Sequence, residues 1–221
     1  MNVPLMQRIN VLTLMIVLTL LAGCTTGVTV EPETGALIRP VAEGTTVSRF
    51  ENGRKGFVLT ETANLNAASR HDFDRAVESM TRGDFDQAIE LFNRVLDVSP
   101  GITAPHINIA MAYRKNDKPE PAEEHLKTAL DLVPGHPVAS NEYGLLLRKS
   151  GRFAEARDIY ANTLTKFPEY YPARRNLGIL CDIYLNDQEC ALTQYEQYNE
   201  ARPDDEQVKL WISELRLRLG Q

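Results

Sequence analysis

Residues 83–88 of the chain read GDFDQA, and versions of this motif return as DKPEPA at 117–122 and as GRFAEA at 151–156. Each motif ends in an alanine, and consecutive motifs are 34 residues apart. The same step separates the members of two further series, Pro100, Pro134 and Pro168, and Phe92, Leu126 and Tyr160. A fourth copy follows at a step of 35, with Ala191, Tyr195 and Pro203. A fixed period of this length indicates an array of repeats, each of which is one supersecondary unit.

Each copy contains two stretches in which apolar residues recur at steps of three and four, which is the spacing of one face of an α-helix. In the first copy the earlier stretch holds Phe73, Ala76, Val77 and Met80, and the later one holds Ala88, Leu91, Phe92 and Val95. A turn residue opens each motif between the two stretches, and a proline ends the second. The sequence therefore predicts an all-α fold of four helical hairpins, at 69–102, 103–136, 137–170 and 171–205.

A period of 34 with a small residue, an aromatic residue or leucine, and a proline in phase resembles the tetratricopeptide repeat (TPR). The resemblance implies a helix–turn–helix unit that stacks into a solenoid, with the TPR domain at 63–221. Small residues on the first helix of each hairpin are expected to face the motif alanines on the second: Ala76, Ala110, Gly144 and Gly178. Residues 206–219 carry apolar side chains at helical spacing, and we expect them to form a helix that caps the stack.

Residues 1–23 are predicted to be a signal peptide. Arg8 precedes an apolar run at 9–21, which is shorter than the roughly 20 residues that span a bilayer. The run ends in LAGC at 21–24, which resembles the bacterial lipobox and implies that Cys24 is lipidated and becomes the first residue. Two threonines follow, where lipoproteins kept in the inner membrane have aspartate. The alternative to a lipobox is a plain signal peptide followed by a chance cysteine. With the lipobox, we expect a lipid-anchored protein on the periplasmic face of the outer membrane.

Residues 24–62 comprise the lipidated cysteine and a linker, which we expect to be an extended tether. The linker is rich in Thr, Gly, Glu and Pro and shows no helical periodicity. Its part at 45–60 is also compatible with a β-hairpin, because Asn52-Gly53 lies between two apolar runs. In that interpretation Phe50 and Phe57 would cover the apolar edge of the first repeat.

Cys181 and Cys190 are expected on facing helices of the fourth hairpin, close to its turn. In an oxidising periplasm, two cysteines nine residues apart across a turn could form a disulfide. The alternative is that both are small buried hydrophobic residues. The extra residue of the fourth copy is expected beside Cys190, as though the turn were rebuilt around the pair. No C-x-x-C motif is present, so a redox-catalytic role is not expected.

The sequence carries no motif of an enzyme active site. A phosphate-binding glycine loop, H-E-x-x-H and G-x-S-x-G are all absent. The four histidines, His71, His106, His125 and His136, lack metal-ligand spacing and are expected at the surface or in turns. A net charge of −6 argues against nucleic acid as a partner. We therefore expect no catalysis, no metal and no cofactor.

In TPR proteins the first helices line a concave face that binds an extended peptide or a helix. In this chain apolar residues on those helices stand beside basic pairs, so an acidic or C-terminal peptide segment would suit the surface. The alternative is that the basic pairs only complement the carbonyl ends of their helices. The groove residues implied by the resemblance are Phe73, Val77, Met80, Ile107, Met111, Arg114, Lys115, Asn141, Leu145, Arg148, Lys149, Arg175, Ile179 and Asp182.

The leading functional hypothesis is a binding module, a membrane-anchored scaffold that holds a protein partner in an envelope assembly. A lipobox followed by repeats is similar to lipoproteins of pilus, secretion, outer-membrane assembly and TonB-type systems. One alternative is a structural oligomer in which Leu210, Trp211 and Leu217 join protomers. The other is a contact regulator of a peptidoglycan enzyme.

Overall fold

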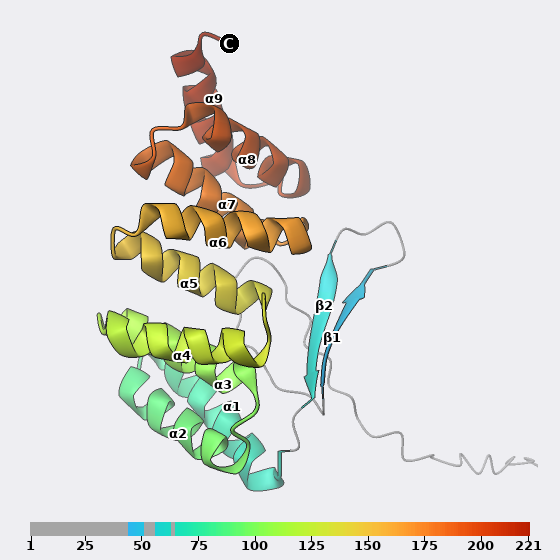
Figure 1. Cartoon of the computed structure of the whole chain (residues 1–221), viewed down its shortest axis with the longest axis vertical. Coiled ribbons are helices and arrows are strands. Elements are labelled where there is room, and N and C mark those ends of the chain that lie inside the picture. Colours follow the sequence, from blue (N-terminus) through green and yellow to red (C-terminus); the bar gives the residue numbers. More distant parts are fainter. Residues whose placement is uncertain (1–43, 51–55, 63–64) are drawn as a thin grey trace, which may run out of the picture.

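The structure, a computed structural model, describes residues 44–50, 56–62 and 65–221 (Figure 1). The predicted signal peptide, the lipidation site Cys24 and the Asn52-Gly53 turn lie outside the described residues. The helices of the described part are α1 (Ala67–Arg82), α2 (Phe85–Val98), α3 (Thr103–Lys115), α4 (Pro119–Leu132), α5 (Pro137–Lys149), α6 (Phe153–Lys166), α7 (Tyr171–Ile179), α8 (Gln188–Ala201) and α9 (Glu206–Leu219), with a π-helical segment, η1 (Leu180–Tyr184), directly after α7.

These helices stack as hairpins in chain order. The pairs α1–α2, α3–α4, α5–α6 and α7–α8 pack against each other, and each pair contacts the next along the stack. Helix α9 packs on α8 and covers the far end, where the chain terminates (Figure 1). The predicted all-α solenoid of four hairpins and a capping helix is confirmed. In the part of the chain that the structure describes, none of the helices combines the length and the apolar character needed to cross a bilayer.

The turn inside each hairpin has the same backbone geometry in all four copies. Gly83, Asp117, Gly151 and Asn186 adopt left-handed conformations, with φ of 84°, 54°, 75° and 52°. In this conformation the N–H turns back toward the last carbonyls of the helix, and glycine, asparagine and aspartate tolerate it best. The first position of the repeated motif therefore specifies where each first helix ends.

At the glycines of the third and fourth first helices, the nearest side chain of the facing helix is a tyrosine. A Cβ atom at Gly144 would lie 2.5 Å from Cε1 of Tyr160, and one at Gly178 would lie 2.5 Å from Cε1 of Tyr195. Both tyrosine rings are almost completely buried. Glycine is present because a tyrosine one turn beyond the motif alanine crosses the first helix at that point. The first two copies combine alanine with phenylalanine or leucine at the same positions.

A β-hairpin precedes the helices and lies beside the stack (Figure 1). Strand β1 (Gly44–Arg49) pairs antiparallel with β2 (Phe57–Thr62), and Val47 is opposite Leu59. Its strands run along the long axis of the stack, on the side where second helices end and first helices begin (Figure 1). Part of the segment expected to be a tether therefore packs against the repeats as a hairpin.

The ring contacts of Phe57 are made with the later repeats. The Phe57 ring lies 4.9 Å from Phe167 and 6.1 Å from Tyr170, at the junction of the third and fourth repeats. Phe50 is 36% exposed. The expectation that both phenylalanines cover the first repeat was wrong, because β2 runs along the stack and its first residue, Phe57, lies at the junction of the third and fourth repeats, while Phe50 is partly exposed.

Candidate partner-binding surface

The extra residue of the fourth repeat lies within its first helix, and the expectation that it lies beside Cys190 was wrong. In the regular copies seven positions separate the small residue of the first helix from the left-handed turn residue. In the fourth copy eight positions separate Gly178 from Asn186. The π-helical segment η1 absorbs the insertion, and the Leu185 N–H donates to the carbonyl five positions back at 3.0 Å.

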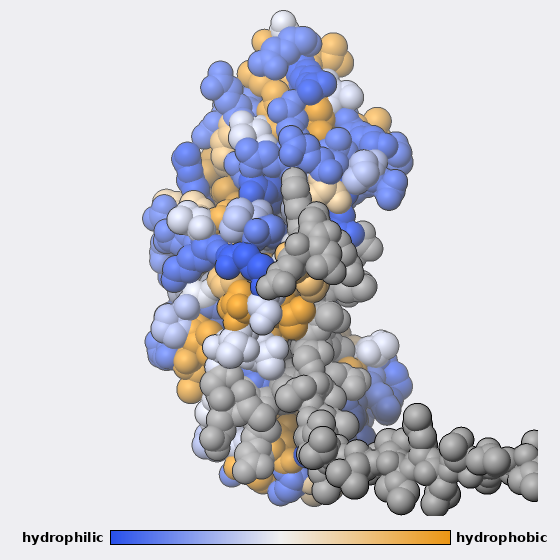
Figure 2. All heavy atoms as spheres, turned by 90° about the vertical axis from the view of Figure 1, so that its right-hand side faces the viewer, coloured by the Kyte–Doolittle hydropathy of each residue, from blue (hydrophilic) through white to orange (hydrophobic). Residues whose placement is uncertain are grey.

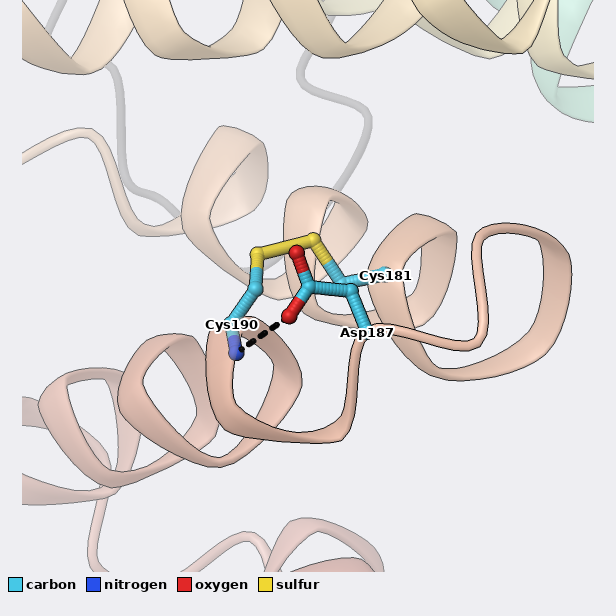
Figure 3. Close-up of side chains that lie close together, drawn as sticks. All are labelled: Cys181, Asp187 and Cys190. Carbon is cyan, nitrogen blue, oxygen red and sulfur yellow. Dashed lines mark hydrogen bonds between the residues drawn. A yellow bond between two sulfur atoms is a disulfide. The ribbon is translucent and has the colours of Figure 1, made fainter.

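A disulfide joins Cys181, in this π-helical segment, to Cys190 in the first turn of α8 (Figure 3). Their Cα atoms lie 5.9 Å apart. Asp187 caps α8, because its Oδ1 accepts from the Cys190 N–H at 3.1 Å, and its other oxygen lies 3.6 Å from Arg157. One ligand atom from each of Cys181, Asp187 and Cys190 falls within 4.8 Å of the others. With both sulfurs in the disulfide, no thiolate is left to bind a metal ion.

The π-helical segment presents two apolar side chains to solvent. Ile183 is 66% exposed and Tyr184 is 44% exposed. The Tyr184 ring lies 4.9 Å from Phe153, and the Arg148 guanidinium sits 5.8 Å from its centre. We call these four residues the π-turn patch. Its aromatic rings, aliphatic side chain and cation are the chemistry found at the centres of protein interfaces.

Sequence reasoning did not select Ile183 or Tyr184, although a signal was present. The corresponding pairs in the other repeats are polar: Thr81-Arg82, Lys115-Asn116 and Lys149-Ser150. Only the irregular copy has two large apolar residues at a position that faces water. Their exposure became evident once the π-helical segment fixed their direction.

Four predicted groove residues are buried. Phe73 packs edge-on against Phe92 of the facing helix, with 5.3 Å between ring centres. Ile107 and Met111 belong to the apolar core, and Asn141 accepts from the Asn176 side-chain amide at 2.9 Å. The expectation that these four side chains lie on an accessible surface was wrong, because Phe73 points at the facing helix and the first helices of the middle repeats are buried on more than one face.

Of the other predicted groove residues, Val77, Met80, Leu145 and Ile179 are partly buried. Ile179 lies four residues before Ile183, and Leu145 is its counterpart one repeat earlier.

Most of the predicted charged groove residues are neutralised within the chain. Arg114 donates to the Glu142 carboxylate of the next repeat at 2.7 Å, and Lys149 pairs with Asp117 of the preceding one. Asp182 pairs with Arg218 at 3.0 Å, and Arg175 pairs with Asp205 at 3.7 Å and lies 4.9 Å from the Trp211 ring centre. These pairs tie adjacent repeats together. Among the described residues Lys115 makes no such pair.

Two buried polar atoms near the patch lack a hydrogen-bond partner in the part of the chain that the structure describes. They are Oη of Tyr160 and one terminal nitrogen of Arg148. Burial raises the pKa of the Tyr160 hydroxyl well above its ordinary value, so this group stays a neutral donor at all physiological pH values. Since Tyr160 and Arg148 can both act as hydrogen-bond donors here, the buried Arg148 nitrogen still needs an acceptor.

The histidines occupy structural positions. His106 and His125 meet between α3 and α4, with 2.9 Å between their Nδ1 atoms. His136 is buried and caps α5, since its Nδ1 accepts from the Ala139 N–H at 3.3 Å. His136 therefore lies in a turn, as predicted, although it is buried, whereas His106 and His125 are partly buried on facing helices and not in turns. On α9, Trp211 packs on Tyr195 at 5.2 Å, whereas Leu210 and Leu217 are 59% and 80% exposed.

Comparisons with known proteins agree with this architecture. Two family models described as tetratricopeptide repeat match residues 79–143 and 141–181. No curated protein sequence matches the chain.

Several solved structures share the fold. A structure of PilF from Pseudomonas aeruginosa is 21% identical with a TM-score of 0.63, over 68% of each chain. A crystal structure of MamA is 22% identical with a TM-score of 0.58, over 66% of this chain and 84% of that one. A thermophilic TPR protein of Thermus thermophilus is 21% identical with a TM-score of 0.57, over 69% of this chain and 84% of that one. Residues 79–181 therefore carry tetratricopeptide repeats, and the described helical part of the chain folds as a TPR solenoid.

Proposed function

We propose that this chain is a lipid-anchored scaffold of the bacterial cell envelope, and that it binds a protein partner through the π-turn patch. The signal-peptide pattern and the lipobox at Cys24 support export and attachment to a membrane. The residues after the cysteine favour the periplasmic face of the outer membrane. The solenoid fold supports binding rather than catalysis, since arrays of this kind present extended surfaces to other proteins.

The observation that carries the proposal is the exposure of Ile183 and Tyr184 on a rigid support. The disulfide at Cys181 fixes one end of the segment, and the Tyr184 ring is held between Phe153 and Arg148. A preorganised apolar patch loses little conformational entropy when a partner binds. Large apolar side chains held in water without a covering element are typical of interaction sites.

The patch also indicates the chemistry of the partner. Ile183 and Tyr184 suit an apolar side chain, and the positive charge of the partly buried Arg148 beside Tyr184 suits a carboxylate or a backbone carbonyl. Because Arg114 and Lys149 are already paired, the surface is less basic than the sequence suggests. We therefore propose a partner segment that combines an apolar anchor with a single acidic or carbonyl group, in place of a strongly acidic peptide.

Site-specific photo-crosslinking in intact cells tests this function. A benzophenone amino acid placed at Ile183 should capture a distinct envelope protein, whereas the same group at Val98, which is 52% exposed at the end of α2, should not. Replacing Tyr184 by alanine in the Ile183 probe strain should reduce the captured product. Identical products from both probe positions would exclude the patch as the binding site.

Self-association is a second candidate, favoured by the exposure of Leu210 and Leu217 on one face of α9. Light scattering on the purified protein would show a dimer that dissociates in a Leu210→Ala/Leu217→Ala variant.

A peptidoglycan enzyme among the captured proteins would favour the regulatory alternative over an assembly scaffold.

A further inference from the structure

Strand β2 lies along the solenoid as an extended peptide would, and it contacts two separate repeats. Near its start, Phe57 packs on Phe167 and Tyr170, where the third repeat meets the fourth. Near its end, the Glu61 carboxylate accepts from the backbone N–H groups of Thr103 at 3.0 Å and Ala104 at 3.2 Å, and from the Thr103 hydroxyl. One strand therefore spans the starts of the second and fourth repeats.

The side chains that face the repeats alternate along β2. Phe57, Leu59 and Glu61 are 5%, 3% and 5% exposed. The other strand contributes little burial, because Val47, which is directly opposite Leu59, is 40% exposed. The contact is thus made by an aromatic residue, an aliphatic residue and an acid at positions i, i+2 and i+4 of a single strand.

The surface beneath the strand repeats with the array. Ile102, His136 and Tyr170 stand at equivalent positions, 34 residues apart, directly before α3, α5 and α7. All three are buried. The loop that carries His136 lies between the two contact points of β2. We call the surface formed by these three loops, on which β2 lies, the loop edge. Figure 2 shows the outer face of the molecule on this side, with apolar side chains gathered at mid-height and a more hydrophilic surface above.

The hairpin does not satisfy all polar groups of the loop edge. His136 accepts through Nδ1, so its Nε2 carries the proton, and this buried donor has no partner among the described residues. Within the same part of the chain, one buried carboxylate oxygen of Glu169 also lacks a partner. Burial raises the pKa of Glu61 despite the hydrogen bonds from Thr103 and Ala104, which shows that docking this carboxylate carries a desolvation penalty. A two-stranded hairpin is only marginally stable without such support.

We propose that the loop edge is a strand-binding surface, that β2 is its internal occupant, and that an extended segment of a partner protein with the pattern aromatic-x-aliphatic-x-acid binds there when the hairpin is displaced. This surface is distinct from the π-turn patch, so the inference does not depend on the function proposed above. The partner strand gains the helix N-terminus of α3 for its acid and the aromatic pocket of Phe167 and Tyr170 for its first anchor.

A second copy of the chain is the less suitable source of the strand. Four residues, 63–66, separate β2 from α1. Five Cα–Cα steps join Thr62 to Ala67, so such a link reaches at most about 18 Å when fully extended. A hairpin exchanged between two copies would need both loop edges within that distance of each other, whereas a free segment of a partner has no such restriction.

Fluorescence anisotropy with a labelled peptide of the β2 sequence, GFVLTET, tests the proposal on the purified full-length protein. We expect weak binding to the natural protein, because the tethered strand competes, and about tenfold tighter binding to a Phe57→Ala/Glu61→Gln variant. The control peptide GAVLTQT should not bind either protein. The matched control variant Val47→Ala, on the exposed strand, should bind GFVLTET as weakly as the natural protein.

A second loosened variant guards against loss of folding. Arg49→Ala removes a hydrogen bond to the Lys166 carbonyl at 2.9 Å and a contact with Glu169, without disturbing the core, and it should also tighten binding. The proposal is overturned if the loosened variants, folded by circular dichroism, bind GFVLTET no more tightly than the natural protein. It is overturned equally if the natural protein is a dimer that dissociates in these variants, because the occupant would then be a second copy. Variants at Ile183 and Tyr184 should leave peptide binding unchanged.

Discussion

Replacing Gly144 by alanine should destabilise the solenoid, although alanine is the better helix former. The new methyl group would lie 2.5 Å from Cε1 and 2.6 Å from Cζ of Tyr160. Carbon atoms in contact normally lie about 3.5–4.0 Å apart, so the ring or the helix must move by about 1 Å. Tyr160 is completely buried and cannot swing into solvent.

Two opposing effects set the magnitude. Removing a helical glycine gains about 1 kcal/mol of stability. Overpacking a buried site costs about 1–3 kcal/mol, and a contact this short belongs at the upper end. We expect a net loss of about 2 kcal/mol in the free energy of unfolding, obtained as the difference between these two effects. At an m-value of about 2 kcal/mol per molar, the urea midpoint falls by about 1 M.

A double-mutant cycle with Tyr160→Leu isolates this contact. The second repeat already combines Ala110 with Leu126 in one packed cluster, so alanine at Gly144 should be tolerated beside leucine. In that background Gly144→Ala should stabilise by about 1 kcal/mol, which gives a coupling of about 3 kcal/mol.

Urea unfolding followed by circular dichroism measures all four corners of the cycle. Gly101→Ala serves as the control, because nothing lies within 4 Å of its Cβ position, and it should change stability by less than about 0.5 kcal/mol. The reasoning fails if Gly144→Ala is as stable as the natural protein, or if Tyr160→Leu does not reverse its effect.

Three further outcomes are expected. Non-reducing peptide mapping should join Cys181 to Cys190, and reduction should lower the unfolding free energy by about 2.5–3 kcal/mol through the closed loop; two free thiols in protein from the periplasm would contradict this. Burial lowers the pKa of His106 to about 4, with a smaller contribution from the charge of His125. Burial also lowers the pKa of His125. Because the unfolded chain binds these protons more tightly, stability is complete above pH 6.5 and falls toward pH 4, and thermal melts of His106→Asn should show a smaller loss over this range than the natural protein. Cys24→Ala should release the protein from membranes and abolish labelling by fatty acid, and persistent labelling would refute the lipobox interpretation.

The candidate surface was only partly predictable from the sequence. The period located the first helices, which carry Arg148 and Ile179, and both side chains are partly buried. It did not predict that Arg114 and Lys149 are neutralised by Glu142 and Asp117. Those partners lie about one repeat away, and pairing at that distance depends on how one hairpin is rotated against the next.

The amino-acid sequence by itself determined the four hairpins, their turns and the capping helix, because 34-residue periodicity, helical spacing and left-handed turn residues are local properties of the chain. Tertiary structure decided three features. Gly144 leaves the space that the Tyr160 ring of the facing helix occupies. The extra residue of the fourth repeat became a π-helical segment that exposes Ile183. The hairpin lies along several repeats because Phe57 packs on Phe167 and Glu61 accepts hydrogen bonds from Thr103, both more than 40 residues away in the sequence. Each depends on contacts between distant segments, which no local pattern records.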